Sequence, residues 1–299
     1  MLNYKSGLIE AKLDKTRKML VEDVSFSIDS GETLALVGET GSGKTIIACS
    51  IMELLPENVV RRGAFIEFSG KKLPSVRDLV KLLGNEIVYI PQSGLECLNQ
   101  SLVIEKHFED SMKKLGVPSS ERRERYIKAL MDVGFTEPEE ILKKYPFELS
   151  GGMGQRVVIA LASCSNAKLV IADEPTNGIE EESKFEFLDL MQRLFPSAAK
   201  LVITHDISVA RTCDRVLVLC KGREMECGPS GMVLESPRSP YTKALLASLV
   251  ENGMHAIPRL RKDRGFCPFY QRCSLAGDAC QSSMKLNEDE NVRWYCNNA

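Results

Sequence analysis

One eight-residue segment constrains the fold more than any other part of the chain. It reads Gly38-Glu39-Thr40-Gly41-Ser42-Gly43-Lys44-Thr45 and matches G-x-x-x-x-G-K-T, the pattern of phosphate-binding loops. The apolar run 33–37 before it predicts a buried parallel strand, and residues 46–52 after it predict a helix. Strand, glycine loop and helix in this order are the context in which the pattern holds a nucleotide. We therefore predict an α/β nucleotide-binding domain.

The residue types in this segment fit phosphate chemistry. Gly38, Gly41 and Gly43 permit backbone conformations that a Cβ would block, so that successive N–H groups turn toward one anion. The helix that follows adds the positive end of its dipole. Lys44 is expected to reach the β- and γ-phosphates, and the Thr45 hydroxyl is expected to ligate Mg²⁺. The alternative is a glycine-rich turn that matches the pattern by chance.

The bulk properties indicate an ordinary water-soluble domain. Of the 299 residues, 43% are hydrophobic and 27% are charged, and the net charge of −2 gives no reason to expect nucleic acid as a partner. No apolar run reaches the length of a membrane span. The first 15 residues lack the apolar core of a signal peptide. We therefore expect a cytoplasmic protein that contacts a membrane only through a partner.

The rest of the pattern describes an α/β domain with a helical insertion. Residues 21–28 alternate apolar and polar side chains, which predicts one half-buried strand. Charged segments separated by Gly and Pro predict three helices between residues 103 and 145. Further strands are expected at 64–69, 86–90, 168–174, 200–204, 214–220 and 223–227, and further helices at 157–164 and 182–194.

Polar residues follow three of the expected strands. Asp173 and Glu174 end the apolar strand 168–174. A carboxylate at the end of a buried strand suits an Mg²⁺ ligand or a partner of its waters, which is the role expected of Asp173. Glu174, next to it, suits the polarisation of an attacking water. Gln92 and His205 each follow another strand, and in isolation both are unremarkable polar residues.

A fourth group lies between the phosphate loop and the acidic pair. It reads Ser150-Gly151-Gly152-Met153 and opens a helix, so its N–H groups make a second anion site. The ordered set of phosphate loop, Gln92, Ser-Gly-Gly signature, Asp-Glu pair and His205 resembles the ATPase subunits of ABC transporters. The resemblance covers about residues 5–250. Ordinary phosphate-loop kinases and GTPases lack the signature.

The resemblance implies a role for each of these residues. ATP is held by residues 38–45, and its Mg²⁺ by Thr45, Gln92 and Asp173. Hydrolysis uses Glu174, with Gln92 and His205 near the γ-phosphate. In this family the signature completes the ATP pocket of an opposite subunit. The implied working unit is therefore a head-to-tail pair, of identical or different subunits, with two ATP molecules at its interface.

Two features depart from the family pattern. The loop after Glu174 usually runs to Leu-Asp, but here it reads Asn177-Gly178-Ile179-Glu180. That segment normally communicates between the two sites, so coupling across the interface is open to question. The adenine-stacking aromatic is also missing from its expected place, because Tyr4 is the only aromatic residue before Phe26 and lies early in the chain.

The later sequence narrows the resemblance to one group of ABC importers. Pro240-Tyr241-Thr242, followed by Leu245 and Leu246, resembles a segment of dipeptide, oligopeptide and nickel importer ATPases. Residues 92–99 resemble the Gln-loop of that group, although Ser93-Gly94 replaces Asp-Pro, and they are expected to contact membrane subunits. The implied α/β architecture is an ABC-type ATPase core with a mixed sheet (1–92 and 155–235), a helical subdomain (93–154) and a small Cys-rich C-terminal extension (236–299).

The implied function is ATP hydrolysis that powers an importer of peptides or nickel. The chain would lie at the cytoplasmic face of the membrane on two permease subunits, and an extracytoplasmic substrate-binding protein would deliver the cargo. One alternative is a soluble ABC ATPase of DNA maintenance, which the short interval 46–148 without heptads disfavours. Another is a non-hydrolysing regulatory partner, which Glu180 suggests and Glu174 and His205 oppose.

Four of the ten cysteines lie in the last 33 residues, at positions Cys267, Cys273, Cys280 and Cys296. Clustered thiols in a reducing compartment suggest a metal site rather than disulfides. Structural zinc more often uses two C-x₂₋₄-C pairs, which are absent here. The peptide-importer ATPases carry a similar set, and some bind a [4Fe–4S] cluster there. The resemblance thus favours the cluster, and zinc and four unliganded thiols remain the alternatives.

Overall fold

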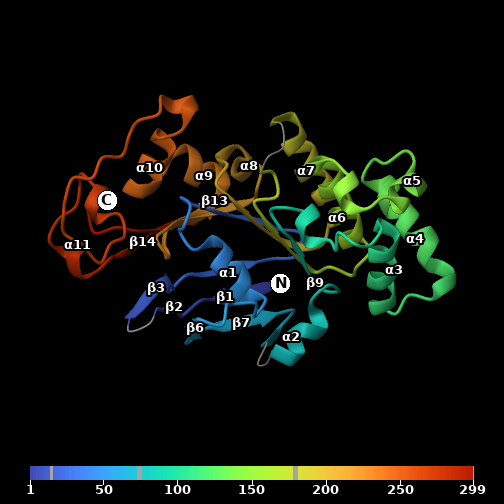
Figure 1. The fold of residues 1–299 in the computed structure, drawn as a ribbon. Coiled ribbons are helices and arrows are strands. Elements are labelled where there is room, and N and C mark those ends of the chain that lie inside the picture. Colours follow the sequence, from blue (N-terminus) through green and yellow to red (C-terminus); the bar gives the residue numbers. More distant parts are fainter. Residues whose placement is uncertain (14–15, 73–75, 178–180, 299) are drawn as a thin grey trace. The chain divides into compact units, whose positions relative to one another are not determined.

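The computed structural model describes residues 1–13, 16–72, 76–177 and 181–298 (Figure 1). The chain forms two compact units. The first unit contains Met1, Asp29–Glu32 and Leu73–Val202, and the second contains Leu2–Ile28, Thr33–Lys72 and Ile203–Ala299. Strand β11 (Ala199–Thr204) runs from the first unit into the second. No helix within the described residues is long and apolar enough to cross a membrane.

Most strands belong to the second unit. Two of its sheets are antiparallel, with the orders β4-β1-β7-β8 and β3-β2-β6. A third set contains parallel β5 and β12, followed by antiparallel β13, β15 and β14. The bounds are β1 Leu2–Lys5, β2 Leu8–Leu13, β3 Thr16–Glu22, β4 Ser25–Ile28, β5 Thr33–Val37, β6 Val59–Arg62, β7 Phe65–Phe68, β8 Lys71–Lys72, β12 Arg215–Cys220, β13 Arg223–Pro229, β14 Leu286–Asp289 and β15 Val292–Tyr295.

The mixed sheet predicted for the core is confirmed by this last set. Strand β5 is buried from Leu34 to Val37, and β12 is buried from Val216 to Cys220. Such continuous apolar runs suit strands that are covered on both faces. The helices of this unit are α1 Lys44–Ile51, α8 Ile207–Arg211, α9 Ser230–Glu235, α10 Pro240–Ala247 and α11 Ala279–Ser282, with 3₁₀ turns η3 Val250–Asn252 and η4 Tyr270–Arg272.

The single strand expected over residues 21–28 is wrong. Strand β3 ends at Glu22 and β4 begins at Ser25, and Asp23 between them has a φ of 52°. The break exists because the chain changes sheets, since β3 pairs with β2 and β4 pairs with β1. The alternation is interrupted at this point by two consecutive polar residues, Glu22 and Asp23, so the break had a signal in the sequence although the change of sheet did not.

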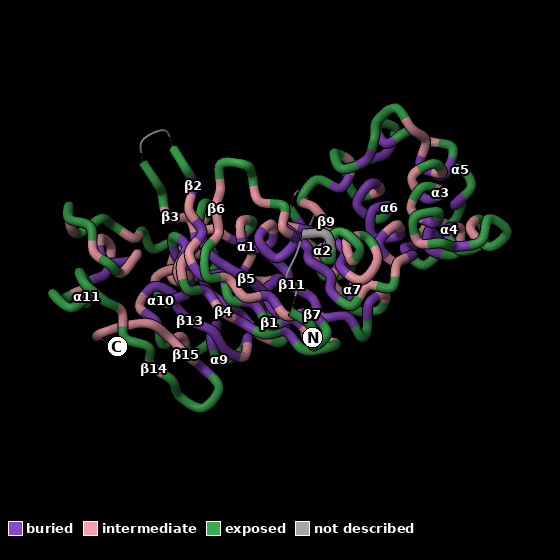
Figure 2. Tube along the Cα trace, turned by 90° about the horizontal axis from the view of Figure 1, so that it is seen from below, coloured by how far each residue is buried: buried purple, intermediate pink, exposed green. Residues whose placement is uncertain are grey.

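The first unit contains most of the predicted helices. Its elements are α2 Val76–Leu82, β9 Ile87–Ile90, η1 Leu95–Cys97, α3 Ile104–Lys114, α4 Ser119–Asp132, α5 Pro138–Lys143, η2 Pro146–Glu148, α6 Gly151–Ser163, β10 Leu169–Asp173 and α7 Glu181–Leu194. Helices α3 to α6 pack together (Figure 1), and buried residues run along α6 (Figure 2). Strands β9 and β10 pair in parallel, and every residue of β10 is buried.

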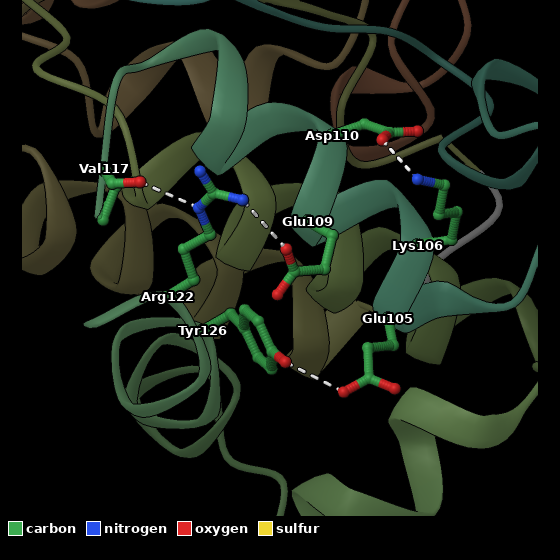
Figure 3. A network of polar contacts seen from close by, with 7 residues as sticks. All are labelled: Glu105, Lys106, Glu109, Asp110, Val117, Arg122 and Tyr126. Carbon is green, nitrogen blue, oxygen red and sulfur yellow. Dashed lines mark hydrogen bonds and ion pairs between the residues drawn. The ribbon is translucent and has the colours of Figure 1, made fainter. Parts of the chain in front are cut away.

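The packing of α3 against α4 combines apolar and polar contacts. Phe108 and Tyr126 are buried, and their ring centroids lie 5.6 Å apart. The Tyr126 hydroxyl donates to Glu105 at 2.8 Å, and Arg122 donates to Glu109 at 3.3 Å and to the Val117 carbonyl at 2.8 Å (Figure 3). Burial and the bond to Glu105 raise the pKa of Tyr126 to about 12, so the hydroxyl remains a donor at neutral pH.

The Cys-rich C-terminal extension contains more regular structure than the sequence predicted. Its hairpin β14–β15 joins the sheet of the second unit, where Glu226 of β13 faces Trp294 of β15. Arg293 donates to both oxygens of Glu224, at 2.6 and 3.0 Å, and the Glu224 side chain is only 1% exposed. The last part of the extension, the hairpin β14–β15, therefore belongs to the sheet.

Candidate nucleotide site

The phosphate loop lies in the second unit, between β5 and α1, as predicted. Gly38, Gly41 and Gly43 have φ values of 154°, 78° and 103°. A Cβ on Gly38 would lie 2.2 Å from the Leu219 carbonyl oxygen, whereas a Cβ on Gly41 would meet nothing within 4 Å. Gly38 is therefore required by the close approach of β12 and Gly41 by its backbone conformation, whereas at Gly43 both the positive φ and a Cβ position 2.9 Å from the Val21 side chain favour glycine.

The loop presents the polar groups that a phosphate needs. Within the described chain no side chain forms a capping hydrogen bond at the start of α1, so the first N–H groups of this helix can donate to a ligand. Lys44 is 7% exposed and donates to the carbonyls of Gly38 at 2.8 Å and Glu39 at 3.3 Å. The buried Ser42 hydroxyl has no hydrogen-bond partner among the described residues. These groups fit a bound triphosphate, whose oxygens can accept from the N–H groups of the loop, from Lys44 and from the Ser42 hydroxyl.

Three further predicted residues of the second unit, Thr40, Thr45 and His205, are exposed. Thr45 lies in the first turn of α1. His205 follows β11, immediately before Asp206. Asp206 caps helix α8 by accepting from the Ser208 backbone N–H at 2.9 Å. The cap fixes the turn in which His205 lies.

The acidic pair lies in the first unit, at the end of β10. Asp173 is 4% exposed and accepts a hydrogen bond of 3.3 Å from the Tyr89 hydroxyl of β9. Glu174 follows with a φ of 47°, a left-handed conformation that is uncommon outside glycine. Its carbonyl accepts from the Asn177 N–H at 3.1 Å. The altered loop at Gly178, Ile179 and Glu180 lies outside the described residues.

The signature begins helix α6 in the first unit. Ser150 is the N-cap, and its side chain accepts from the Met153 N–H at 3.3 Å. Gly151 and Gly152 are exposed in the first turn. A Ser N-cap satisfies one of the N–H groups at the helix start and leaves others directed outward. The predicted second anion site therefore lies at a helix N-terminus whose first turn exposes two glycines.

Helix α6 also contacts the segments that carry Gln92 and Glu174. A Cβ on Gly154 would lie 2.3 Å from the Leu95 side chain, so only glycine allows η1 to pack this closely. Gln155, which is 5% exposed, donates to the Pro175 carbonyl just after Glu174. Gln92 itself is exposed after β9. Within this unit the three predicted groups are thus linked through one helix.

Sequence reasoning missed Gln155 and Arg272. Gln155 lies two residues after the signature, and this proximity was the available signal in the sequence. Arg272 donates from Nη1 and Nη2 to the two carboxylate oxygens of Glu39 in the phosphate loop, at 2.6 and 2.7 Å. Nothing in the sequence indicates that these two residues, 233 positions apart, form an ion pair.

Tyr4 does not serve as a ring exposed for adenine. It is 2% exposed, lies 5.1 Å from the Phe26 ring and shares a 3.0 Å hydrogen bond with Ser50. Burial raises its pKa to about 12. Tyr4 is therefore a core residue, which agrees with its position too early in the chain for the adenine site.

The four C-terminal cysteines line one cavity of about 20 Å³ in the second unit, beside Tyr241 and Tyr270. Burial raises the pKa of Cys267 to about 11 and also raises the pKa of Cys273. The Asn298 backbone N–H donates to the Cys296 sulfur at 3.4 Å, and the backbone groups of Phe269 and Leu275 offset part of the rise in the pKa of Cys267 and Cys273 respectively. Across the described residues, no group of three or more His, Cys, Asp or Glu side chains is arranged to hold a metal ion.

Comparisons with known proteins identify the family of the chain. The family profile described as ABC transporter matches residues 21–177. A second profile, described as Oligopeptide/dipeptide transporter, C-terminal region, matches residues 225–280. The chain is 38% identical over 279 residues to the oligopeptide transport ATP-binding protein AppD of Bacillus subtilis, covering 87% of this chain and 84% of AppD. It is 37% identical over 257 residues to OppD of the same organism, covering 83% and 72%.

The dimeric structure of the ABC transporter cassette MJ0796 has the same fold, with a TM-score of 0.68 over 77% of this chain and 99% of that one. Its identity of 24% supports the fold alone. A phosphate loop, an Asp-Glu strand and a Ser-Gly-Gly helix together define an ATPase of the cassette type. The chain belongs to the ABC transporter family. It is an ATP-binding subunit that hydrolyses ATP to drive transport.

Proposed function

We propose that this chain is the ATPase subunit of a peptide importer and is held at the cytoplasmic face of the membrane by two permease subunits. One observation carries the proposal: its C-terminal region, residues 225–280, matches that of oligopeptide and dipeptide transporters. AppD and OppD, which are named for oligopeptide transport, extend the similarity to more than four-fifths of the chain. An extracytoplasmic binding protein would deliver the peptide.

The proposed mechanism starts at the phosphate loop. The N–H groups of residues 38–45 and the start of α1 hold the β- and γ-phosphates, and Lys44 turns its ammonium from the loop carbonyls to the phosphate oxygens. Glu174 accepts a proton from the attacking water. Gln92 and His205 orient that water and the γ-phosphate. The strained backbone at Glu174 supports this role, because such conformations concentrate at functional positions.

Mg²⁺ would be held by Thr45, Asp173 and Gln92. Hydroxyl, carboxylate and amide oxygens are ligands that this ion accepts. When bound, the ion neutralises charge that develops on the phosphates. The Tyr89 hydroxyl fixes one carboxylate oxygen of Asp173, so the carboxylate is oriented in advance.

We also propose the division of the chain into three parts. The ATPase core comprises residues 1–92 and 155–235, the helical subdomain comprises residues 93–154, and the C-terminal extension comprises residues 236–299.

The working unit would be a pair of ATPase subunits, identical or different. The N-terminus of α6, with exposed Gly151 and Gly152, supports this arrangement because it offers donors to a phosphate of the partner's ATP. ATP binding would close the pair, and hydrolysis would reopen it. Dilution tests the shared site. The ATPase activity per subunit should decrease when the protein concentration is lowered below the dissociation constant of the pair. Activity that is constant over that range would contradict it.

The four C-terminal cysteines are proposed to bind a [4Fe–4S] cluster. Four thiols line one cavity and supply the number of ligands that such a cluster uses, and the Asn298 N–H donates to the Cys296 sulfur, but the four side chains as they lie are not arranged to hold a metal ion. The space fits less well, since about 20 Å³ is room for roughly one water molecule. Loading would therefore require the four side chains to move apart. Zinc, a single ion, demands less space.

Anaerobic purification separates these outcomes. A cluster gives a brown protein with about four iron and four sulfide per chain. Cys280→Ser should lose the colour and retain ATP binding, and Cys164→Ser, at a buried site in the first unit, should retain both. A colourless protein with one tightly bound zinc would replace the cluster by a zinc site, and a metal-free protein would leave four thiols.

Transport itself is tested with the chain and its permease subunits in vesicles. Uptake of a labelled oligopeptide that requires ATP supports the proposal, and Glu174→Gln should abolish it. Uptake of Ni²⁺ without uptake of peptides would assign the chain to nickel import. Failure to copurify with any permease would favour a non-transport ABC ATPase.

A further inference from the structure

The four-cysteine segment contacts the phosphate loop through one ion pair. Arg272 donates from both terminal nitrogens to the two oxygens of Glu39, at 2.6 and 2.7 Å. The Arg272 side chain is 19% exposed and that of Glu39 is 38% exposed. Two parallel bonds between planar groups fix orientation as well as distance. The side chain of Glu39 therefore has one preferred place, which the C-terminal segment determines.

The packing of the cysteine segment determines where Arg272 lies. Arg272 ends the 3₁₀ turn η4, between Cys267 and Cys273. Its backbone N–H donates to the Phe269 carbonyl at 2.9 Å, and its guanidinium lies over the Phe269 ring at 5.4 Å. The Tyr270 N–H donates to the Cys267 carbonyl at 3.0 Å. A movement of either cysteine would consequently move the guanidinium.

Tyr241 connects the cavity of the cysteines to the Phe269 ring, over which Arg272 lies. Tyr241 lines this cavity, is fully buried and meets the Phe269 ring edge-on at 5.4 Å. Burial raises the pKa of Tyr241, and the nearby Cys220 and Glu39 raise it further. Phosphate loop, Tyr241, Phe269 and cysteines thus form one packed region of the second unit.

Arg272 offsets a charge that opposes nucleotide binding. Glu39 is an acidic residue within a loop that holds phosphates, and the hydrogen bonds from Arg272 lower its pKa, so it is ionised at neutral pH. An unpaired carboxylate there would repel the triphosphate and allow the Glu39–Thr40 turn to move. The ion pair removes both effects.

We propose that Arg272 is a positioning residue for the phosphate loop and makes nucleotide affinity depend on the packing of the four-cysteine segment. The inference rests on the ATP-binding role of the loop and holds whether the cysteines bind a cluster, zinc or nothing. Rearrangement of the four thiols on loading would move Arg272 and thereby change the affinity for ATP.

The first test is binding of fluorescent mant-ATP with Mg²⁺ to the full chain. Arg272→Ala should raise Kd about tenfold, the order expected when a partly exposed bidentate pair near a charged ligand is lost. Arg238→Ala is the matched control, because Arg238 forms an exposed ion pair with Asp289 in the same unit at 3.1 Å. Its Kd should stay within about twofold of wild type. Equal Kd values for both variants would overturn the proposal.

A double-mutant cycle shows whether Arg272 acts through Glu39. In the Glu39→Gln background, Arg272→Ala should change Kd by less than about twofold, because no carboxylate remains to be offset. Arg272→Lys should recover part of the lost affinity. A purely structural role would give the same tenfold loss in both backgrounds, and that result would refute the positioning role.

The last test concerns the cysteines. Cys273→Ser should raise Kd in the wild-type background and leave it unchanged in Arg272→Ala, whereas the control Cys164→Ser should leave it unchanged in both. Circular dichroism verifies that each variant is folded. No effect of Cys273→Ser, or an equal effect in both backgrounds, would refute the link. These measurements use the isolated chain, whereas peptide uptake requires the permease subunits. The role of Arg272 and the role in peptide import can therefore be refuted independently of each other.

Discussion

Two glycines of the phosphate loop allow a matched test of why the loop has its conformation. Gly38→Ala and Gly41→Ala both place a Cβ on a residue with positive φ, 154° and 78° respectively. Adopting a positive φ costs about 1–2 kcal/mol for a residue other than glycine. The two variants differ in what the new methyl group meets.

Only at Gly38 does the methyl group collide with the backbone. Its distance to the Leu219 carbonyl oxygen would be 2.2 Å, whereas at Gly41 the nearest atoms lie beyond 4 Å. Relief requires the end of β12 or the loop to shift by about 1 Å in a close-packed interior, which adds roughly 1–3 kcal/mol. We expect Gly38→Ala to lower the free energy of unfolding by about 2–5 kcal/mol and Gly41→Ala by about 1–2 kcal/mol.

Urea unfolding measures both values. Trp294 is the single tryptophan and lies on β15 in the same unit as the loop, so its fluorescence follows the relevant transition. Mant-ATP binding should be weakened more in Gly38→Ala than in Gly41→Ala. If the two unfolding free energies agree within about 0.5 kcal/mol, the close approach of β12 does not determine the residue at position 38.

Three further predictions concern single side chains. Glu174→Gln should retain mant-ATP binding and lose at least about 100-fold in ATP turnover, since an amide accepts no proton; unchanged turnover would exclude the role. Arg293→Met leaves the buried Glu224 without its partner and should cost about 3 kcal/mol in urea unfolding, and a cost near zero would show that the pair is dispensable. The pKa of Glu39 is lowered in the folded chain, so its contribution to stability is present above its ordinary value of about 4.3 and is lost as the pH falls further. The stability difference between wild type and Glu39→Gln should therefore shrink below about pH 4, and a constant difference would contradict it.

Local patterns were sufficient to predict the elements that carry the nucleotide site. The strand before Gly38, the helix after Gly43, the N-cap Ser150 and the buried strand before Glu174 all follow from short-range periodicity and capping chemistry. Each of these features is determined by residues within about ten positions of one another, which is the range over which sequence patterns are informative.

Features that depend on distant partners were not predictable in the same way. The break at Asp23 arises because the chain changes sheets, and the hairpin β14–β15 is stabilised by pairing with β13. The Arg272–Glu39 pair joins residues 233 positions apart. Propensity carries no information about such partners, since tertiary pairing decides the outcome.

The hairpin at the C-terminal end also determines which strand forms the edge of its sheet. Without it, the edge of β13 would present open backbone groups beside apolar Met225 and Cys227, each 2% exposed. Such an edge readily pairs with strands of other chains. The hairpin replaces it with β14, a four-residue strand that contains Asn287, Glu288 and Asp289. Short, acidic edge strands resist pairing, so the C-terminal hairpin protects this edge of the sheet against aggregation.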